Sequence, residues 1–205
     1  MAGRYRAGPG MHIAILTFDG FNELDSLIAL GILNRIKQPG WRVSLAASSE
    51  TVTSMNGVKL HRQARLDEIE SFDAVLVGSG IKTREIAQDA DVMQWLARLD
   101  PKRQLIGAQC SGTLLLAKAG LLAGVPGCTD LTSKPWVQEA GIEVLEQPFF
   151  ARGNLATAGG CLASIYLAAW TLARLVGRDA AAEALHYVAP VGEKGEYVAR
   201  ALGNI

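Results

Sequence analysis

Residues 105–119, LIGAQCSGTLLLAKA, join a short apolar run directly to a segment with the composition of a helix. An apolar run of this length is typical of a buried strand, and Cys110 stands where that strand would turn into the helix. A thiol gains little from packing at such a junction. Gly112 follows closely and would spare a tight turn a side-chain clash. The stretch therefore predicts a nucleophile elbow at the carboxyl end of a strand, where open parallel sheets bind their ligands.

Strand-like runs alternate with helix-like segments on both sides of this stretch. Strands are expected at residues 12–18, 41–47, 74–80 and 104–109, and helices at residues 22–37, 89–99, 111 to about 124, and 162–176. Residues 154–160 complete the core, a last helix begins at residues 179–186, and a small hairpin is expected around Asn56-Gly57. This order predicts an α/β fold: a mostly parallel, doubly wound sheet with right-handed crossover helices on both faces.

The first expected helix has signals at both ends. Asn22 can cap its start, and the carboxylates of Glu23 and Asp25 lie in its first turn. Arg35 and Lys37 would occupy the last turn before Pro39-Gly40. These signals predict a helix over residues 22–37.

The overall composition limits the kinds of partner. Twenty basic and twenty acidic residues cancel in the 205-residue chain, so its charge favours neither nucleic acid nor an anionic membrane, and a neutral small molecule fits better. The apolar runs fall far short of the ~20 residues that span a bilayer, and the start lacks an apolar signal core, so a cytoplasmic protein is expected. Residues 1–10 are expected to be a disordered tail or tag-like extension, and residues 11–205 a single domain.

The three cysteines, Cys110, Cys128 and Cys161, are an odd number without metal-ligand spacing. They suggest neither a disulfide framework nor a zinc site, and no metal or other cofactor is expected. Cys128 and Cys161 are expected to be small buried residues, although Cys161 follows two glycines and could face the pocket. At the elbow, helix N–H groups would stabilise a Cys110 thiolate and lower its pKa from about 8.5 to roughly 3.5–7.5. Alternatively, Cys110 is a small buried apolar residue, and the spacing alone does not separate the two.

Five segments, in order along the chain, resemble the PfpI/ThiJ family, which is related to the class I glutamine amidotransferases. They are FDGFNELDSLIALGIL, VLVGSGI, AQCSGTLLLAKAGLLAG, GNLATAGG and LHYVAP, and they lie between about Met11 and Pro190. The resemblance implies a flavodoxin-like fold and a homodimer. It also implies that Cys110 is the nucleophile and that Asp25, by its place in the ELD segment, is an acidic residue hydrogen-bonded to it.

The resemblance also implies a set of residues around the sulfur: Gly80, Ile81, Ser111, Gly112, Gly159 and Gly160. Gly80 and Ile81 would supply oxyanion-binding amides, and Ser111 a further N–H. Simpler alternatives stay open, because Asp25 could be a first-turn carboxylate that bonds back to its helix cap, and residues 78–80 a plain turn. Glu23 is the fallback acid if the register differs.

The chain departs from the family at the histidine that several members carry beside the cysteine. Ser111 follows Cys110, and Asp130 stands where the second kind of histidine would align, so a Cys-His dyad is not expected. His186, in LHYVAP, is a possible pocket residue. Asp25, Cys110 and Ser111 together resemble the isonitrile hydratase branch, whose matching residues are acidic, Cys and Thr. The following HYVAPVGEKG lacks the proline-and-phenylalanine stretch of those hydratases.

Three functions stay open. The first is a cysteine-dependent lyase or hydrolase acting on a small uncharged compound, with hydration of an isonitrile to an N-substituted formamide as its most specific form. The second is glyoxalase or deglycase-type activity on α-oxoaldehydes, which needs Asp25, Glu23 or His186 as a base. The third is a non-enzymatic redox or stress sensor that works through oxidation of Cys110. The ligand-sensing half of a transcription regulator is not favoured, because the chain ends at Ile205 without room for a helix-turn-helix domain.

Overall fold

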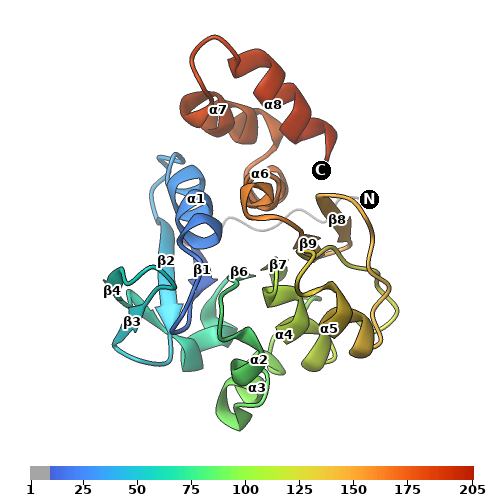
Figure 1. Cartoon of the computed structure of the whole chain (residues 1–205). Helices are drawn as coiled ribbons and strands as arrows, with labels where there is room; N and C mark the ends of the chain where they lie inside the picture. The colour runs from blue at the N-terminus through green and yellow to red at the C-terminus, as the bar shows by residue number, and fades with distance from the viewer. Residues whose placement is uncertain (1–9) are drawn as a thin grey trace.

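A seven-stranded sheet forms the centre of the computed structural model, which describes residues 10–205 (Figure 1). Its order is β5-β2-β1-β6-β7-β9-β8, and all neighbours are parallel except β8 and β9. The strands are β1 (Met11–Leu16), β2 (Trp41–Ala47), β5 (Ala64–Arg65), β6 (Ala74–Val77), β7 (Leu105–Gln109), β8 (Phe149–Arg152) and β9 (Leu155–Ala158). The mostly parallel α/β sheet predicted from the sequence is confirmed. The tail predicted for residues 1–10 lies, apart from Gly10, outside the described residues.

Helices cover both faces of the sheet, and each face has its own apolar core. One face packs against α1 (Glu23–Leu33) and α6 (Ser164–Leu175), with α7 (Arg178–Val188) and α8 (Lys194–Gly203) beyond them. The other packs against η1 (Leu66–Ser71), α3 (Ala90–Leu96), α4 (Gly112–Lys118) and α5 (Lys134–Glu139), and the short α2 (Thr83–Ile86) lies near α4. Strands buried on both faces explain the continuous apolar runs in the sequence. No helix within residues 10–205 combines the length and apolarity needed to cross a bilayer.

A small hairpin stands beside the main sheet, as the Asn56-Gly57 turn predicts. Its antiparallel strands are β3 (Thr51–Thr53) and β4 (Lys59–His61). Gly57 has a φ of 87°, a backbone conformation that glycine adopts without steric cost. The hairpin brings Met55 to the edge of the central cleft described below.

Several predicted boundaries are wrong. The first helix ends at Leu33, because the Asn34 side chain bonds back to the Leu30 carbonyl, so Arg35 and Lys37 lie outside it. Helix α4 ends at Lys118 instead of near Gly124, with Gly120 at a φ of 77° just after it. The antiparallel edge strand β8 and the final helix α8 were not predicted from the sequence.

Candidate functional site

Cys110 forms a strained turn between β7 and α4. It has a φ of 47° and is the one non-glycine residue with positive φ in the described part of the chain. Such a conformation persists when its surroundings hold it in place. The Cys110 N–H donates to the Ala158 carbonyl at 2.8 Å, and the Cys110 carbonyl accepts from Thr129 Oγ1 at 2.7 Å. The predicted strand-to-helix elbow is therefore present.

Gly112 lets this elbow pack tightly against the end of β6. A Cβ atom at this position would lie 2.6 Å from the carbonyl oxygens of both Val77 and Gly78. Backbone atoms cannot move aside as a flexible side chain can. The glycine thus fixes the start of α4 directly beside the loop that follows β6.

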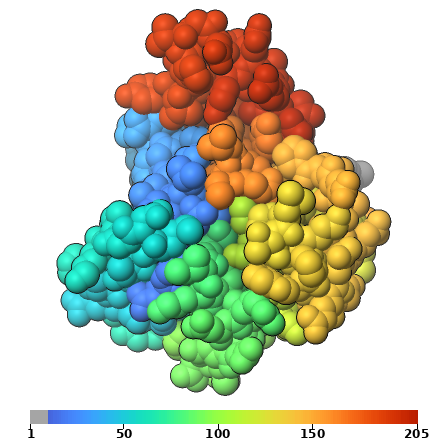
Figure 2. Space-filling model, viewed as in Figure 1, coloured from blue at the N-terminus to red at the C-terminus, as the bar shows by residue number. Residues whose placement is uncertain are grey.

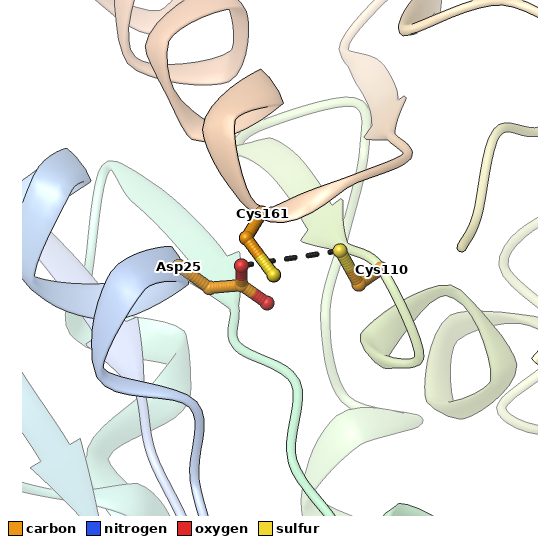
Figure 3. Close-up of side chains that lie close together, drawn as sticks. All are labelled: Asp25, Cys110 and Cys161. Carbon is orange, nitrogen blue, oxygen red and sulfur yellow. Dashed lines mark hydrogen bonds between the residues drawn. The ribbon is translucent and has the colours of Figure 1, made fainter. Parts of the chain in front are cut away.

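The Cys110 thiol faces the carboxyl group of Asp25, which comes from the first turn of α1 (Figure 3). The distance from Cys110 Sγ to Asp25 Oδ1 is 3.9 Å, and the thiol donates. Ser79, after β6, donates its hydroxyl hydrogen to Asp25 Oδ2. Asp25 is 2% exposed and Cys110 3% exposed, so this pair is almost out of contact with bulk water.

Burial controls the titration of this pair. It raises the pKa of Asp25 to about 6, although hydrogen bonds from Ser79, Cys161 and Cys110 favour the ionised form. Burial and then the charge of Asp25 also raise the pKa of Cys110, and the N–H of Gly160 offsets only part of that rise. The sequence predicted a lowered pKa at the elbow, and the structure gives the opposite direction. A neutral thiol beside a carboxylate that can take up a proton is therefore the resting state near neutral pH.

The predicted oxyanion loop is engaged in bonds of its own. The Gly80 N–H donates to Ser111 Oγ at 3.2 Å, and the Ile81 N–H donates to the Gly20 carbonyl at 3.0 Å. Ser111 Oγ also lies 2.7 Å from Thr83 Oγ1. The Ser111 hydroxyl thus ties α4 to the loop, and neither loop amide is free. The N–H groups of Ser111 and Gly112 have no acceptor within residues 10–205, so they join the Gly160 N–H as donors near Cys110.

Glu23 and Asp130, the other carboxylates considered for the site, lie in different places. Glu23 accepts hydrogen bonds from Ser54 Oγ and, at 2.9 Å, from Asn56 Nδ2, so it holds the hairpin turn and is not placed beside Cys110. The bond from Ser54 lowers the pKa of Glu23. Asp130 lines the cleft with Cys110, and its Oδ1 accepts the Ser133 N–H at 2.9 Å.

The remaining predicted residues fall on two sides of the molecule. Gly159 packs against the Thr129 backbone, since an added Cβ would lie 2.3 Å from that carbonyl oxygen, and Gly160 has a φ of 90°. His186 lies on α7 and lines a separate cleft between α7 and α8. The Gly160 N–H lies near the Cys110 sulfur, but neither glycine is among the residues that line the cleft with Cys110, and His186 lies away from that site.

A cleft of about 420 Å³ opens at the carboxyl ends of the strands, where residues from six segments of the chain meet (Figure 2). Its lining combines Cys110 and polar groups with the apolar side chains of Met55, Ile81 and Trp136. The full lining is Asn22, Met55, Ser79, Gly80, Ile81, Cys110, Ser111, Asp130, Thr132, Ser133, Trp136 and Cys161. It contains no Lys, Arg or His side chain from the described residues.

Cys161 was expected to be a small buried residue that could face the pocket, and the structure has it half-buried and lining the cleft. Cys161 begins η2 (Cys161–Ala163), and Figure 3 shows its side chain between those of Asp25 and Cys110. The two sulfur atoms and a carboxylate oxygen of Asp25 all lie within 4.8 Å of one another. Asn22 Nδ2 donates to Cys161 Sγ at 3.1 Å. The preceding glycine pair was the one sequence signal for this position.

The fold and the elbow define a class: doubly wound α/β proteins with a cysteine at the end of a central strand. Residues 11–174 match the model of the DJ-1/PfpI family, and the chain belongs to this family. A deglycase of Thermococcus kodakarensis is 25% identical over 147 residues, which are 70% of this chain and 87% of the relative. The isonitrile hydratase of Pseudomonas putida is 26% identical over 130 residues, which are 63% of this chain and 57% of the relative. The solved structure of Schizosaccharomyces pombe DJ-1 superposes with a TM-score of 0.77 at 18% identity, covering 88% of this chain and all (100%) of that one.

Proposed function

We propose that this protein is a cysteine-dependent hydratase that converts a small neutral isonitrile, R–NC, to the N-substituted formamide. The observation that carries the proposal is the pair of Cys110 and Asp25, 3.9 Å apart, with Cys110 lining a cleft that has no histidine or cationic side chain among its described lining residues. Such a pair can exchange one proton between sulfur and carboxyl. That exchange is what addition of a thiol across an isonitrile carbon requires.

The reaction follows from the position of that proton. Cys110 transfers its proton to Asp25 as its sulfur attacks the terminal carbon of R–NC, and Asp25 delivers the proton to the same carbon, which gives the thioimidate R–N=CH–S. Water adds to that carbon, the nitrogen takes up a proton, and the C–S bond breaks to give R–NH–CHO and the free Cys110 thiol. The pKa of Asp25, about 6, suits both acceptance and donation near neutral pH.

The cleft favours a neutral, partly apolar substrate. Met55, Ile81 and Trp136 offer apolar surface for the R group, and none of the described lining residues is a cation that could hold an anionic one. The N–H groups of Ser111, Gly112 and Gly160 are donors available to charge that develops beside the sulfur. Ser111 also acts as a positioning residue, since its hydroxyl holds the Gly80 loop.

The test is formamide production from a panel of alkyl and aryl isonitriles, followed by NMR in the presence of a reductant and a chelator. We expect turnover by the wild-type protein and its loss in Cys110→Ser. Cys128→Ser is the matched control, because Cys128 is completely buried, does not line the cleft and should leave turnover intact. Wild-type protein that reacts with none of the isonitriles, or a Cys110→Ser variant as active as wild type, would disprove the proposal.

Deglycase-type activity is the second candidate, and one observation favours it. Several relatives carry that name, among them proteins of Thermococcus kodakarensis and Pyrococcus furiosus, which are 25% and 20% identical. Attack of Cys110 on an α-oxoaldehyde gives a hemithioacetal, whose carbon-bound proton must then move. Asp25, with its pKa near 6, is the base that the described residues place close to the sulfur. Turnover of methylglyoxal, without formamide from isonitriles, would favour this alternative.

A further inference from the structure

We propose that Asp25, Cys110 and Cys161 form a binding site for a soft divalent metal ion, with Zn²⁺ as the natural probe. The site uses Cys161, which the proposed hydration does not require. It also combines residues that are far apart in the sequence, so their spacing shows no metal motif.

The donor atoms already converge. One sulfur comes from the elbow after β7, one from η2, and the carboxylate from α1, and all lie within 4.8 Å of one another. Zinc binds thiolate sulfur at about 2.3 Å and carboxylate oxygen at about 2.0–2.2 Å, so its ligands sit less than about 4 Å apart. Small side-chain rotations are enough to close this set around an ion. Because Cys161 and Cys110 both line the open cleft, water can supply a fourth ligand.

Two of the three proposed ligands, Cys161 and Asp25, accept a hydrogen bond from a neighbouring side chain. Asn22 Nδ2 donates to the Cys161 sulfur at 3.1 Å, and the Ser79 hydroxyl donates to the Asp25 oxygen that the Cys110 thiol does not contact. Outer groups of this kind orient metal ligands. They also stabilise the ionised forms of the donors, which are the forms that bind a metal.

The charge of the cleft also favours a bound cation. Once metal binding has displaced the two thiol protons, two thiolates and the Asp25 carboxylate place three negative charges together, and Asp130 on the cleft wall adds a fourth. None of the described residues that line the cleft carries a positive charge to balance them. A divalent cation supplies that charge, and two sulfur ligands select a soft ion over magnesium or calcium.

Metal binding would compete with the chemistry proposed above. On binding, the two thiol protons leave to solvent and the Cys110 sulfur becomes a metal ligand, so it can no longer attack a substrate. Zinc would therefore inhibit turnover reversibly. This consequence rests on the proposed function, whereas the binding itself does not.

The test is titration of reduced, chelator-stripped protein with Zn²⁺ against a competing zinc indicator, and separately with Co²⁺ in the spectrophotometer. We expect one zinc ion per chain and, with cobalt, the near-ultraviolet charge-transfer absorption of thiolate ligands. Cys161→Ser should weaken zinc binding by at least about 100-fold, since loss of a ligand costs no less than loss of an outer partner. Cys128→Ser, which removes a buried thiol outside the cluster, should bind as wild type does.

Asn22→Ser tests the hydrogen bond to Cys161 separately from the ligand itself. Serine keeps an oxygen that can cap α1, where Asn22 now accepts the Leu24 N–H, but removes the N–H donor to Cys161. We expect zinc affinity to fall by about tenfold. Absence of stoichiometric zinc binding in the wild type, or binding unchanged in Cys161→Ser, would overturn the metal site. Neither result depends on whether isonitriles are substrates.

Discussion

Substitution of Asp25 by asparagine is expected to stabilise the protein near neutral pH. The pKa of Asp25 rises in the folded state from 3.8 to about 6, because burial penalises its charged form. Between these two values the folded state holds one proton more than the unfolded state, so the free energy of unfolding falls as the pH rises. A shift of about two units at about 1.4 kcal/mol each corresponds to a loss of about 3 kcal/mol above pH 6. The asparagine side chain carries no charge and avoids this loss.

The assay is urea unfolding of both proteins, followed by circular dichroism at several pH values with a reductant and a chelator present. The free energy of unfolding of Asp25→Asn should exceed that of wild type by about 3 kcal/mol near pH 8 and equal it near pH 4. Asp19→Asn is the control, since Asp19 is exposed and its hydrogen bond from the Thr53 N–H needs only an oxygen acceptor. Equal stability of Asp25→Asn and wild type at pH 8 would refute the argument from burial.

Three further changes test Gly112, Glu23 and His186, one residue of the elbow and two that lie away from Cys110. Gly112→Ala should lower stability by about 1–3 kcal/mol and slow turnover, because its Cβ would lie 2.6 Å from two backbone oxygens, and thermal melts with formamide assays would detect both effects. For Glu23→Gln, the difference in unfolding free energy from wild type should depend on pH in the opposite way to that of Asp25→Asn. The wild type gains stability above pH 4.5 from the bonds to ionised Glu23 and loses it as the pH falls, so the deficit of the variant in urea unfolding should vanish in acid. His186→Ala should leave formamide production unchanged, because His186 lines a different cleft, and a large loss of turnover would contradict that placement.

The sequence predicted the fold well where its signals are local. Apolar runs such as AVLV and LIGAQ become strands that are buried on both faces, and the Asn22 cap begins α1 as expected. The helix ends were harder to predict because they depend on contacts from elsewhere in the chain. The Leu33 carbonyl at the end of α1, for instance, accepts from Trp41 Nε1 at 2.9 Å, across the loop to β2.

The pairing of Asp25 with Cys110 could be expected from the sequence, but the electrostatics of the pair could not. The family resemblance identified Asp25, and the elbow pattern identified Cys110. The direction in which the pKa of Cys110 shifts depends on how deeply the sulfur is buried and on which charge it faces. A local sequence pattern predicts neither of these. The approach of Cys161 is likewise a tertiary fact, since β9 and η2 must pack beside the elbow to produce it.

The sheet order explains why these particular segments meet. Strands β1, β6, β7 and β9 are consecutive neighbours in the sheet, and β1 with β6 is the point where the chain stops adding strands on one side and begins on the other. Asp25 follows β1, Ser79 follows β6, Cys110 follows β7 and Cys161 follows β9. The carboxyl ends of adjacent parallel strands lie at one edge, where the helices that leave on opposite faces open a crevice. Four separate segments are therefore held to one small volume by the sheet itself. That rigid support allows a strained cysteine and a buried carboxylate, each costly to the fold, to persist side by side.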